Sequence, residues 1–316
     1  MTASSSLHTV ACLGTGAMGH GVAFLCAKAG NAVRLFGRTD ESLAKGLEGI
    51  RKACALYERY GLPMPAGGTK TILERVQGFT DAGEAAHGAD FVMESVAESL
   101  AVKHAVFAEA EARCPEHAIL ATNTSSLSVS AVSAGLRRPE RFVAVHFFNP
   151  PYLMPTVEVC PGPSTAPGVK EAAAAWVTSL GNMPIVLEKE VRGFLINRIQ
   201  MACLREALYM VEQGWASAET VDRAIVHSLG RRYAVTGPIE SAELGGLDVF
   251  NTVLDQLCPV LGKAEQASPL IKNAVAQGRF GAKTGGGLFD WPDERVAERM
   301  GKREAHLAAR MKDTGE

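Results

Sequence analysis

A glycine-rich turn near the N-terminus constrains the fold of this chain more than any other feature. The turn Gly14-Thr-Gly-Ala-Met-Gly19 follows an apolar run, Thr9–Leu13, and a helix-like segment, residues 20–30, leads from it to a second apolar run. A G-x-G-x-x-G pattern alone is a weak signal, but on a strand-to-helix turn inside a β-α-β unit it predicts a dinucleotide-binding site. The alternative is a glycine-rich turn without a ligand.

Each glycine of the turn has its own expected function. Gly14 permits the tight turn, Gly16 lets a pyrophosphate approach the backbone, and Gly19 lets the helix pack closely on the strand. The N-terminus of the helix supplies N–H donors for the phosphates.

The first half of the chain alternates short apolar runs with helix-like segments, which is typical of a parallel doubly wound sheet. The expected strands are Thr9–Leu13, Ala32–Phe36, Gly78–Thr80, Asp90–Val96, Ile119–Ala121, Phe142–Phe147, Thr156–Cys160 and Pro184–Leu187. Beyond Val191 the pattern becomes helical, beginning with residues 193–213. We therefore predict an α/β fold: a Rossmann-type, mostly parallel dinucleotide-binding domain over residues 1–190, followed by an all-α substrate and dimerisation domain over residues 191–316.

The helical half contains two segments of opposite character. The predicted helix Phe194–Val211 is apolar on more than one face, so we expect it to be buried within the second domain or between the subunits of a homodimer. The last segment, residues 293–312, mixes both charge signs and is expected to be a solvated helix.

Bulk properties exclude several classes of partner. The formal net charge of -2 gives no basic field for nucleic acid, and no apolar run approaches the roughly 20 residues that span a bilayer. The seven cysteines are dispersed without a C-x-x-C pair, which indicates a reducing compartment. Because the N-terminus lacks the features of a signal peptide, we expect a cytoplasmic protein without a membrane or nucleic-acid partner. No metal site is predicted.

The end of the second strand bears on the choice between NAD and NADP. Gly37 stands where NAD-binding proteins usually carry an acid for the ribose 2′-hydroxyl, and Arg38 could hold a 2′-phosphate in a forked geometry. These two residues favour NADP. Asp40 and Glu41 follow at once and favour NAD, although they are better explained as capping and first-turn charge for the helix Ser42–Ile50.

Two apolar strands each contain a titratable residue. His146 lies at the carboxyl end of Phe142–Phe147, where a doubly wound sheet binds its ligand, and Glu158 lies in Thr156–Cys160. A buried carboxylate needs a cationic or donor partner, and an imidazole that takes up a proton would supply one. The sequence therefore predicts that the two side chains pair. Next to a nicotinamide, His146 would remove the proton of an alcohol while Glu158 fixes its tautomer and stabilises the imidazolium.

Further polar groups could complete such a site. Ser125 and Ser126 follow the strand Ile119–Ala121 and could bond a substrate oxygen, or could simply cap a helix. Asn197 interrupts an apolar helical stripe, so its amide could stabilise a carbonyl oxygen that gains negative charge.

Six segments, in this order, resemble the L-3-hydroxyacyl-CoA dehydrogenase family over most of the chain. They are Gly14-Thr-Gly-Ala-Met-Gly19, Asn123-Thr-Ser-Ser-Leu127, His146-Phe-Phe-Asn-Pro150, Val157-Glu-Val159, Gly193-Phe-Leu-Ile-Asn-Arg198 and Phe280-Gly-Ala-Lys-Thr-Gly-Gly-Gly287. The resemblance implies His146 as base, Glu158 as its partner, and Ser125 and Asn197 as substrate contacts. It also implies that four residues help to seat the nicotinamide half of the cofactor: Glu98, Lys103, Asn123 and Asn149. The implied reaction is oxidation of a 3-hydroxyacyl compound, of the kind that serves fatty acid metabolism.

The substrate class stays open between two branches of the family. Pro150-Pro-Tyr-Leu-Met-Pro155, Arg192 and Arg231-Arg-Tyr-Ala-Val-Thr-Gly-Pro238 resemble the branch of λ-crystallin and L-gulonate 3-dehydrogenase, whereas Lys283-Thr-Gly-Gly-Gly-Leu-Phe-Asp-Trp291 is similar to the acyl-CoA branch. In the first case Arg232 or Arg192 would hold the carboxylate of a free 3-hydroxy acid, the alternative being a surface or interface salt bridge. In the second, Arg51 and Lys52 are a weak candidate patch for CoA phosphates. A non-catalytic, crystallin-like dinucleotide-binding protein is a third alternative.

Overall fold

The computed structural model describes residues 8–313 of the chain. The chain forms two compact units. One comprises the described residues up to Leu195 together with those from Lys302 onward, and the other comprises Ile196–Gly301.

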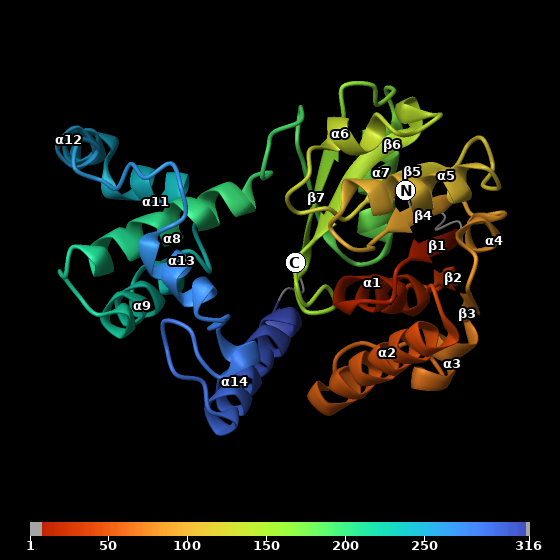
Figure 1. Cartoon of the computed structure of the whole chain (residues 1–316), viewed down its shortest axis with the longest axis horizontal. Coiled ribbons are helices and arrows are strands. Elements are labelled where there is room, and N and C mark those ends of the chain that lie inside the picture. Colours follow the sequence, from red (N-terminus) through yellow and green to blue (C-terminus); the bar gives the residue numbers. More distant parts are fainter. Residues whose placement is uncertain (1–7, 314–316) are drawn as a thin grey trace. The chain divides into compact units, whose positions relative to one another are not determined.

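The first unit is built on an eight-stranded sheet in the order β3-β2-β1-β4-β5-β6-β7-β8 (Figure 1). The strands are β1 Thr9–Leu13, β2 Ala32–Phe36, β3 Val76–Phe79, β4 Phe91–Glu94, β5 Ile119–Thr122, β6 Phe142–Phe147, β7 Thr156–Pro161 and β8 Met183–Val186. The first six are parallel, β7 runs antiparallel to β6, and β8 is parallel to β7. All eight predicted strands are present, and the Rossmann-type fold is confirmed.

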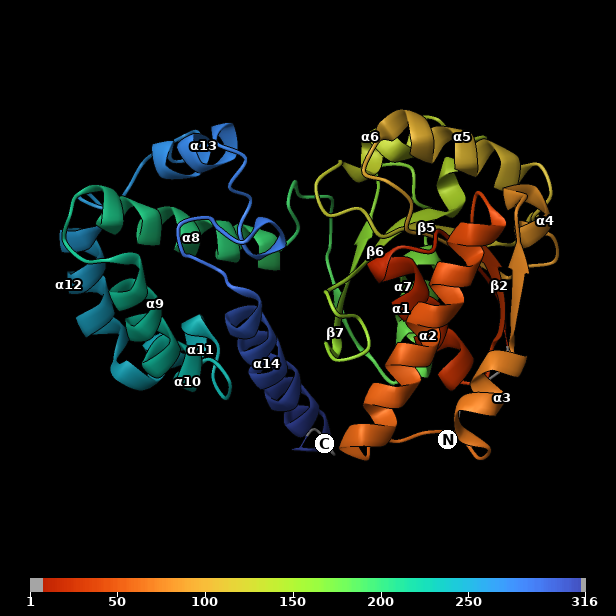
Figure 2. The same cartoon turned by 60° about the horizontal axis from the view of Figure 1, so that its bottom comes forward.

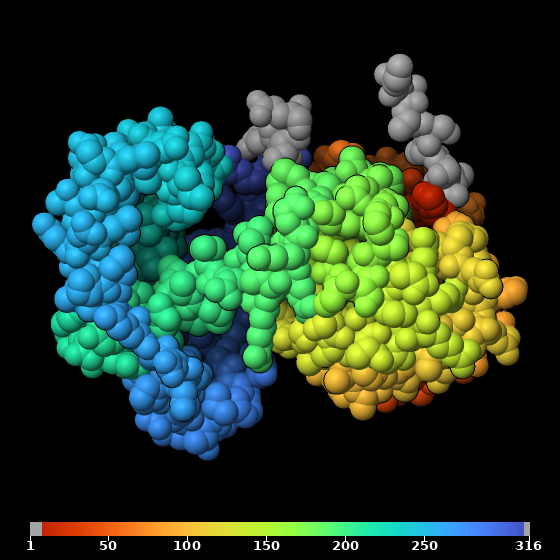
Figure 3. Space-filling model, turned by 90° about the horizontal axis from the view of Figure 1, so that it is seen from above, coloured from red at the N-terminus to blue at the C-terminus, as the bar shows by residue number. Residues whose placement is uncertain are grey.

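Helices cover both faces of this sheet (Figure 2). They are α1 Ala17–Lys28, α2 Asp40–Tyr60, α3 Gly68–Glu74, α4 Ala82–Ala86, α5 Leu100–Glu111, α6 Val129–Ser133, the 3-10 helix η1 Pro139–Arg141 and α7 Val169–Ser179. Successive side chains of β1 enter opposite layers: Val10 and Cys12 pack in one apolar cluster, Ala11 and Leu13 in the other. Burial on both faces explains why the strands read as continuous apolar runs. Figure 3 shows the later segments of this unit, coloured yellow to green, side by side on one face.

Helix α2 is longer than predicted and begins earlier. Thr39 is its N-cap and exchanges hydrogen bonds with Ser42, while Asp40 and Glu41 lie in the first turn. The interpretation of these two acids as first-turn charge therefore agrees with the structure, but the capping residue is Thr39.

The second unit is all-helical. Its helices are α8 Ile196–Glu212, α9 Ala218–His227, α10 Leu229–Arg232, α11 Pro238–Gly245, α12 Leu247–Leu257, α13 Pro269–Ala276 and the 3-10 helix η2 Ala282–Thr284. Helix α8 begins at Ile196, because Gly193 and Phe194 both have positive φ, of 80° and 50°. Within the single chain its apolar residues are largely exposed, Ile199 at 62% and Met201 at 50%, while Leu208 is buried. Across residues 8–313, no helix is long and apolar enough to cross a membrane.

The final helix, α14 Asp293–Asp313, differs from the solvated helix predicted for this segment. Ala308 is fully buried in the apolar cluster that contains α1 and α2, and Leu307 and Met311 pack against that cluster. The helix also makes an ion pair, in which Arg59 contacts Glu304 over 3.3 Å. Its few apolar residues form a narrow stripe among many charges, which is why composition alone indicated a solvated helix.

Candidate active site

The register of two antiparallel strands brings His146 and Glu158 together. The two residues are direct partners in the β6–β7 ladder, so their side chains emerge on the same face of the sheet. Nδ1 of His146 lies 2.8 Å from Oε2 of Glu158. Glu158 is fully buried and His146 is 5% exposed. The predicted pairing is therefore confirmed, and it engages Nδ1 of the imidazole.

The second oxygen of the Glu158 carboxylate is also bonded. Its Oε1 accepts a hydrogen bond of 2.8 Å from the backbone N–H of Leu195, the residue that directly precedes the second unit. A buried carboxylate bonded through both oxygens has a fixed plane, and a fixed plane in turn orients the imidazole that it contacts.

The glycine turn is shaped as a pyrophosphate site requires. A Cβ at Gly14 would lie 2.4 Å from the carbonyl oxygen of Ser95, and a Cβ at Gly19 would lie 2.1 Å from the carbonyl oxygen of Gly14. By contrast, a Cβ at Gly16 would meet nothing within 4 Å. Gly16 is also the N-cap of α1 and carries no side-chain cap. Close packing thus explains two of the glycines, and the open space over Gly16, beside free helix N–H groups, fits a phosphate.

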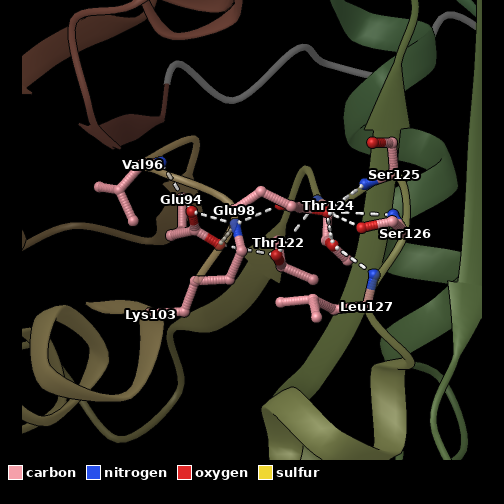
Figure 4. A network of polar contacts seen from close by, with 9 residues as sticks. All are labelled: Glu94, Val96, Glu98, Lys103, Thr122, Thr124, Ser125, Ser126 and Leu127. Carbon is pink, nitrogen blue, oxygen red and sulfur yellow. Dashed lines mark hydrogen bonds and ion pairs between the residues drawn. The ribbon is translucent and has the colours of Figure 1, made fainter. Parts of the chain in front are cut away.

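A polar network shapes the loop that follows β5 (Figure 4). Oε1 of Glu98 accepts hydrogen bonds from Thr124 Oγ1, from the N–H groups of Ser125 and Ser126, and from Ser126 Oγ. Its other oxygen, Oε2, lies 3.2 Å from Nζ of Lys103. Partial burial alone would raise the pKa of Glu98, but the hydrogen bond from Thr124, the Lys103 charge and the bonds from Ser126 lower it to about 2. Glu98 is therefore an ionised anchor for this loop.

The same network continues inward to a fully buried ion pair. Nζ of Lys103 lies 2.7 Å from Oε1 and 3.0 Å from Oε2 of Glu94, and the two side chains are 1% and 0% exposed. Glu94 also accepts bonds from the N–H of Val96 and from Thr122 Oγ1. The resemblance implied that Lys103 seats the nicotinamide, but here its ammonium is enclosed by two carboxylates. The same ammonium contacts Glu98 and so links the buried pair to the loop that follows β5.

Asn123, Asn149 and Ser125 lie near the carboxyl ends of neighbouring strands. Oδ1 of Asn123 accepts a bond of 2.8 Å from the N–H of Phe147, which ties the loop after β5 to the residue that follows His146. The carbonyl of Asn149 accepts a bond from Arg303 of α14. Because β5 and β6 are parallel, their carboxyl ends share one edge of the sheet with the glycine turn after β1.

At the end of β2, Arg38 is exposed. Packing also favours glycine at position 37, since a Cβ there would lie 2.6 Å from Oγ of Ser42 and 2.9 Å from Cγ2 of Thr15.

The remaining predicted residues lie elsewhere in the chain. Arg192 lies in the segment after β8, and Asn197 and Arg232 belong to α8 and α10 of the second unit.

Three residues of this network are not among the site residues predicted from the sequence: Glu94, Thr122 and Thr124. Glu94 could have been found, because it is a carboxylate in an apolar strand, the same signal that identified Glu158. The two threonines carry no such signal, since threonine is an ordinary strand residue.

Comparison with protein families identifies two matching domains. The model described as 3-hydroxyacyl-CoA dehydrogenase, NAD binding domain, matches residues 9–191. The model of the 3-hydroxyacyl-CoA dehydrogenase C-terminal domain matches residues 193–291.

Two curated relatives and one solved structure illustrate the similarity. A 5-formyl-3-hydroxy-2-methylpyridine 4-carboxylate 5-dehydrogenase from Mesorhizobium japonicum is 30% identical over 304 residues, 96% of this chain and 97% of the relative. The mitochondrial hydroxyacyl-coenzyme A dehydrogenase of Homo sapiens is 33% identical over 288 residues, 89% of this chain and 90% of the relative. A crystal structure of such a pyridine carboxylic acid 5-dehydrogenase, described as an NAD+-dependent dismutase, superposes with a TM-score of 0.89 at 30% identity, covering 96% of this chain and 97% of that one.

Proposed function

Because the chain belongs to the 3-hydroxyacyl-CoA dehydrogenase family of NAD-dependent oxidoreductases, we propose that it oxidises the hydroxyl group of a 3-hydroxyacyl compound to the 3-keto product. The observation that carries this proposal is the buried contact of 2.8 Å between His146 and Glu158. It lies at the sheet edge that also carries the glycine turn, where a doubly wound fold binds its ligand.

Proton transfer is assigned to the His–Glu pair. Glu158 accepts the Nδ1–H of His146, so that the unprotonated Nε2 can take the proton of the substrate hydroxyl, and the carboxylate stabilises the resulting imidazolium. Ser125 bonds the substrate oxygen, and the amide of Asn197 stabilises the charge on that oxygen. A bound nicotinamide supplies the hydride acceptor. Glu98, Lys103 and Asn123 keep the loop that carries Ser125 in position.

Two substitutions test this assignment. His146→Gln is expected to reduce kcat by about 10²–10⁴, and Glu158→Gln by roughly tenfold or more, because each disables general base action. Cofactor affinity, measured by quenching of tryptophan fluorescence, should change little. His87→Gln, at an exposed histidine, is the matched control and should retain full activity. Wild-type turnover in His146→Gln would refute the assignment.

A small free acid is a second candidate substrate. It is favoured by the pyridine carboxylate dehydrogenase relative, which matches this chain over nearly its whole length. A panel of 3-hydroxyacyl-CoA thioesters and free 3-hydroxy acids such as L-gulonate, followed by the absorbance of the reduced nicotinamide, separates the two candidates. A free-acid enzyme would show kcat/KM values for the free acids well above those for the thioesters.

For a free acid, we assign the substrate carboxylate to Arg232 or Arg192. A guanidinium binds a carboxylate through two parallel hydrogen bonds. Arg232→Ala should then reduce kcat/KM for acidic substrates alone. An equal loss on all substrates would identify a structural ion pair instead.

For the cofactor, we propose that Arg38 gives NADP an advantage over NAD. The proposal is supported by the absence of an acid at Gly37 and by the exposure of Arg38. Fluorescence titrations with NADPH and NADH test it, with Arg38→Ala expected to weaken NADPH binding selectively. A tenfold preference of the wild type for NADH would overturn it.

We further propose that a second copy of the chain covers the helical unit. Within Ile196–Gly301, all of it described, the buried large apolar side chains are Leu208 and Val221, whereas Val235 and Ile239 are 82% and 79% exposed. Exposed apolar surface on this scale marks an interface, and a homodimer is the commonest assembly. Light scattering should give twice the chain mass, and Ile239→Glu should shift the equilibrium toward monomer.

A further inference from the structure

A single phenylalanine after β8 combines an unusual backbone with an unusual position. Among residues 8–313, Phe194 is the one residue other than glycine with positive φ, at 50°. A bulky side chain in this region is strained, whereas the preceding Gly193, at 80°, is not. Glycine at position 194 would relieve the strain, so the aromatic side chain itself calls for an explanation.

The phenyl ring of Phe194 covers the imidazole of His146. The two rings are stacked, with centroids 5.2 Å apart and planes inclined by 19°. Phe194 is 2% exposed, so its ring is held firmly by its surroundings. On another side, Phe148 meets the imidazole edge-on at 4.8 Å and 65°. The imidazole is therefore confined by aromatic rings as well as by Glu158.

The same turn also reaches the other member of the pair. The N–H of Phe194 bonds the carbonyl of Val191 at 3.1 Å and closes the turn. The next N–H, that of Leu195, bonds Oε1 of Glu158 at 2.8 Å. One strained turn thus places an aromatic ring on the histidine and an amide on the glutamate.

We propose that Phe194 is a positioning residue of the active site, which fixes the plane of the His146 imidazole and excludes water from its hydrogen bond to Glu158. An imidazole held by one hydrogen bond can still tilt about that bond, and a stacked ring removes this freedom. A sealed Nδ1–H···carboxylate contact is also strengthened by its low-dielectric surroundings. The inference depends on the proposed function only in its kinetic consequences.

Three substitutions distinguish the effect of the phenyl ring from the effect of the backbone strain. Phe194→Leu and Phe194→Gly both remove the ring, and only the glycine variant relieves the strain. Both are expected to reduce kcat by roughly 10- to 100-fold, the loss typical of a small misplacement of a catalytic group, with KM changed by less than about threefold. Phe194→Tyr keeps a stacked ring and should retain near wild-type kcat. Wild-type kcat in the glycine variant would overturn the proposal.

Phe91→Leu is the matched structural control. Phe91 is 3% exposed and stacks on Trp176 at 3.9 Å and 14°, so it resembles Phe194 in burial and geometry. Its substitution should lower the melting temperature without changing kcat of the folded protein. Should Phe91→Leu lose as much kcat as Phe194→Leu, the effect on turnover is one of general packing and the proposal fails.

A second measurement needs no substrate. The Nδ1–H of an imidazole bonded to a buried carboxylate gives a far-downfield proton NMR resonance when it is protected from water. This resonance, assigned by its loss in His146→Gln, should persist in Phe194→Tyr and Phe91→Leu and disappear or broaden in Phe194→Leu. An unchanged resonance in Phe194→Leu overturns the proposal.

The outcomes distinguish this inference from the proposed function. If the substrate panel shows no turnover but the resonance is lost in Phe194→Leu, the positioning effect stands and the assigned reaction fails. Phe194→Met replaces Phe194→Leu if the latter does not fold. If no variant without an aromatic ring folds while Phe194→Tyr does, Phe194 is required for folding and the proposal is overturned.

Discussion

Glu98 offers a direct test of the loop that carries Ser125. In Glu98→Gln, Oε1 can remain an acceptor for Thr124, Ser125 and Ser126, but the amide NH₂ then faces the ammonium of Lys103 in place of Oε2, which lies 3.2 Å from it. The substitution therefore removes one negative charge while keeping the shape of the side chain.

The magnitude follows from the pKa of Glu98. Its hydrogen bonds and the charge of Lys103 outweigh burial and lower the pKa from 4.5 to about 2. At about 1.36 kcal/mol per pKa unit, this lowering of the pKa corresponds to about 3.4 kcal/mol. The side chain is 37% exposed, so solvent screening reduces the expected contribution to roughly 1–2 kcal/mol.

The sign of the pH dependence is set by the lowered pKa. A carboxyl whose pKa is depressed in the folded state stabilises that state above its unfolded pKa, and the contribution is lost as pH falls through the folded pKa. The wild type should thus exceed Glu98→Gln in stability at pH 7. The difference in free energy of unfolding between the wild type and Glu98→Gln should be smaller by roughly two-fifths at about pH 3.5.

Urea unfolding at both pH values provides the measurement. In a background of Trp215→Phe and Trp291→Phe, Trp176 alone reports on the first unit, where it packs on Phe91. Glu109→Gln, at an exposed position of α5, is the control and should lie within about 0.5 kcal/mol of the parent. The reasoning would be refuted if the wild type and Glu98→Gln differed by less than about 0.5 kcal/mol at pH 7, or if their difference increased on acidification.

Three further predictions concern other parts of the chain. Gly16→Ala should fold normally but weaken cofactor binding roughly tenfold or more, because the open space over Gly16 is assigned to a phosphate. Gly19→Ala should instead lower the melting temperature, because its Cβ would lie 2.1 Å from the carbonyl oxygen of Gly14. In native protein at about pH 8, iodoacetamide should leave Cys160 unlabelled, since this thiol is buried and burial raises its pKa to about 11; peptide mass spectrometry checks this, and early labelling of Cys160 would contradict it. Ala308→Asp should destabilise the protein by about 2 kcal/mol or more, as judged by thermal unfolding, whereas a solvated α14 would tolerate the change.

Local chemistry made the glycine turn and the eight strands predictable. The strands are buried on both faces, so their apolar runs are continuous and visible without knowledge of their neighbours. The His146–Glu158 pair was predictable for a related reason, because a titratable side chain in such a run requires a partner. Glu94 carries the same signal and could have been inferred in the same way.

Other features depend on contacts between distant residues and could not be read from the sequence. The burial of Lys103 between two carboxylates, the packing of Ala308 and the ion pair of Arg59 with Glu304, 245 positions away, each need the folded chain. A charged or small residue has no preferred partner until tertiary structure supplies one.

The sequence by itself therefore determined the fold class, the dinucleotide turn and the pairing of His146 with Glu158, since each follows from a local pattern of residue types. Tertiary structure alone decided how that pair is held: the ladder register that aligns its two members, the buried charges behind the Ser125 loop, and the left-handed turn at Phe194. The physical reason is that register, burial and backbone strain are properties of contacts between segments, and no single segment contains them.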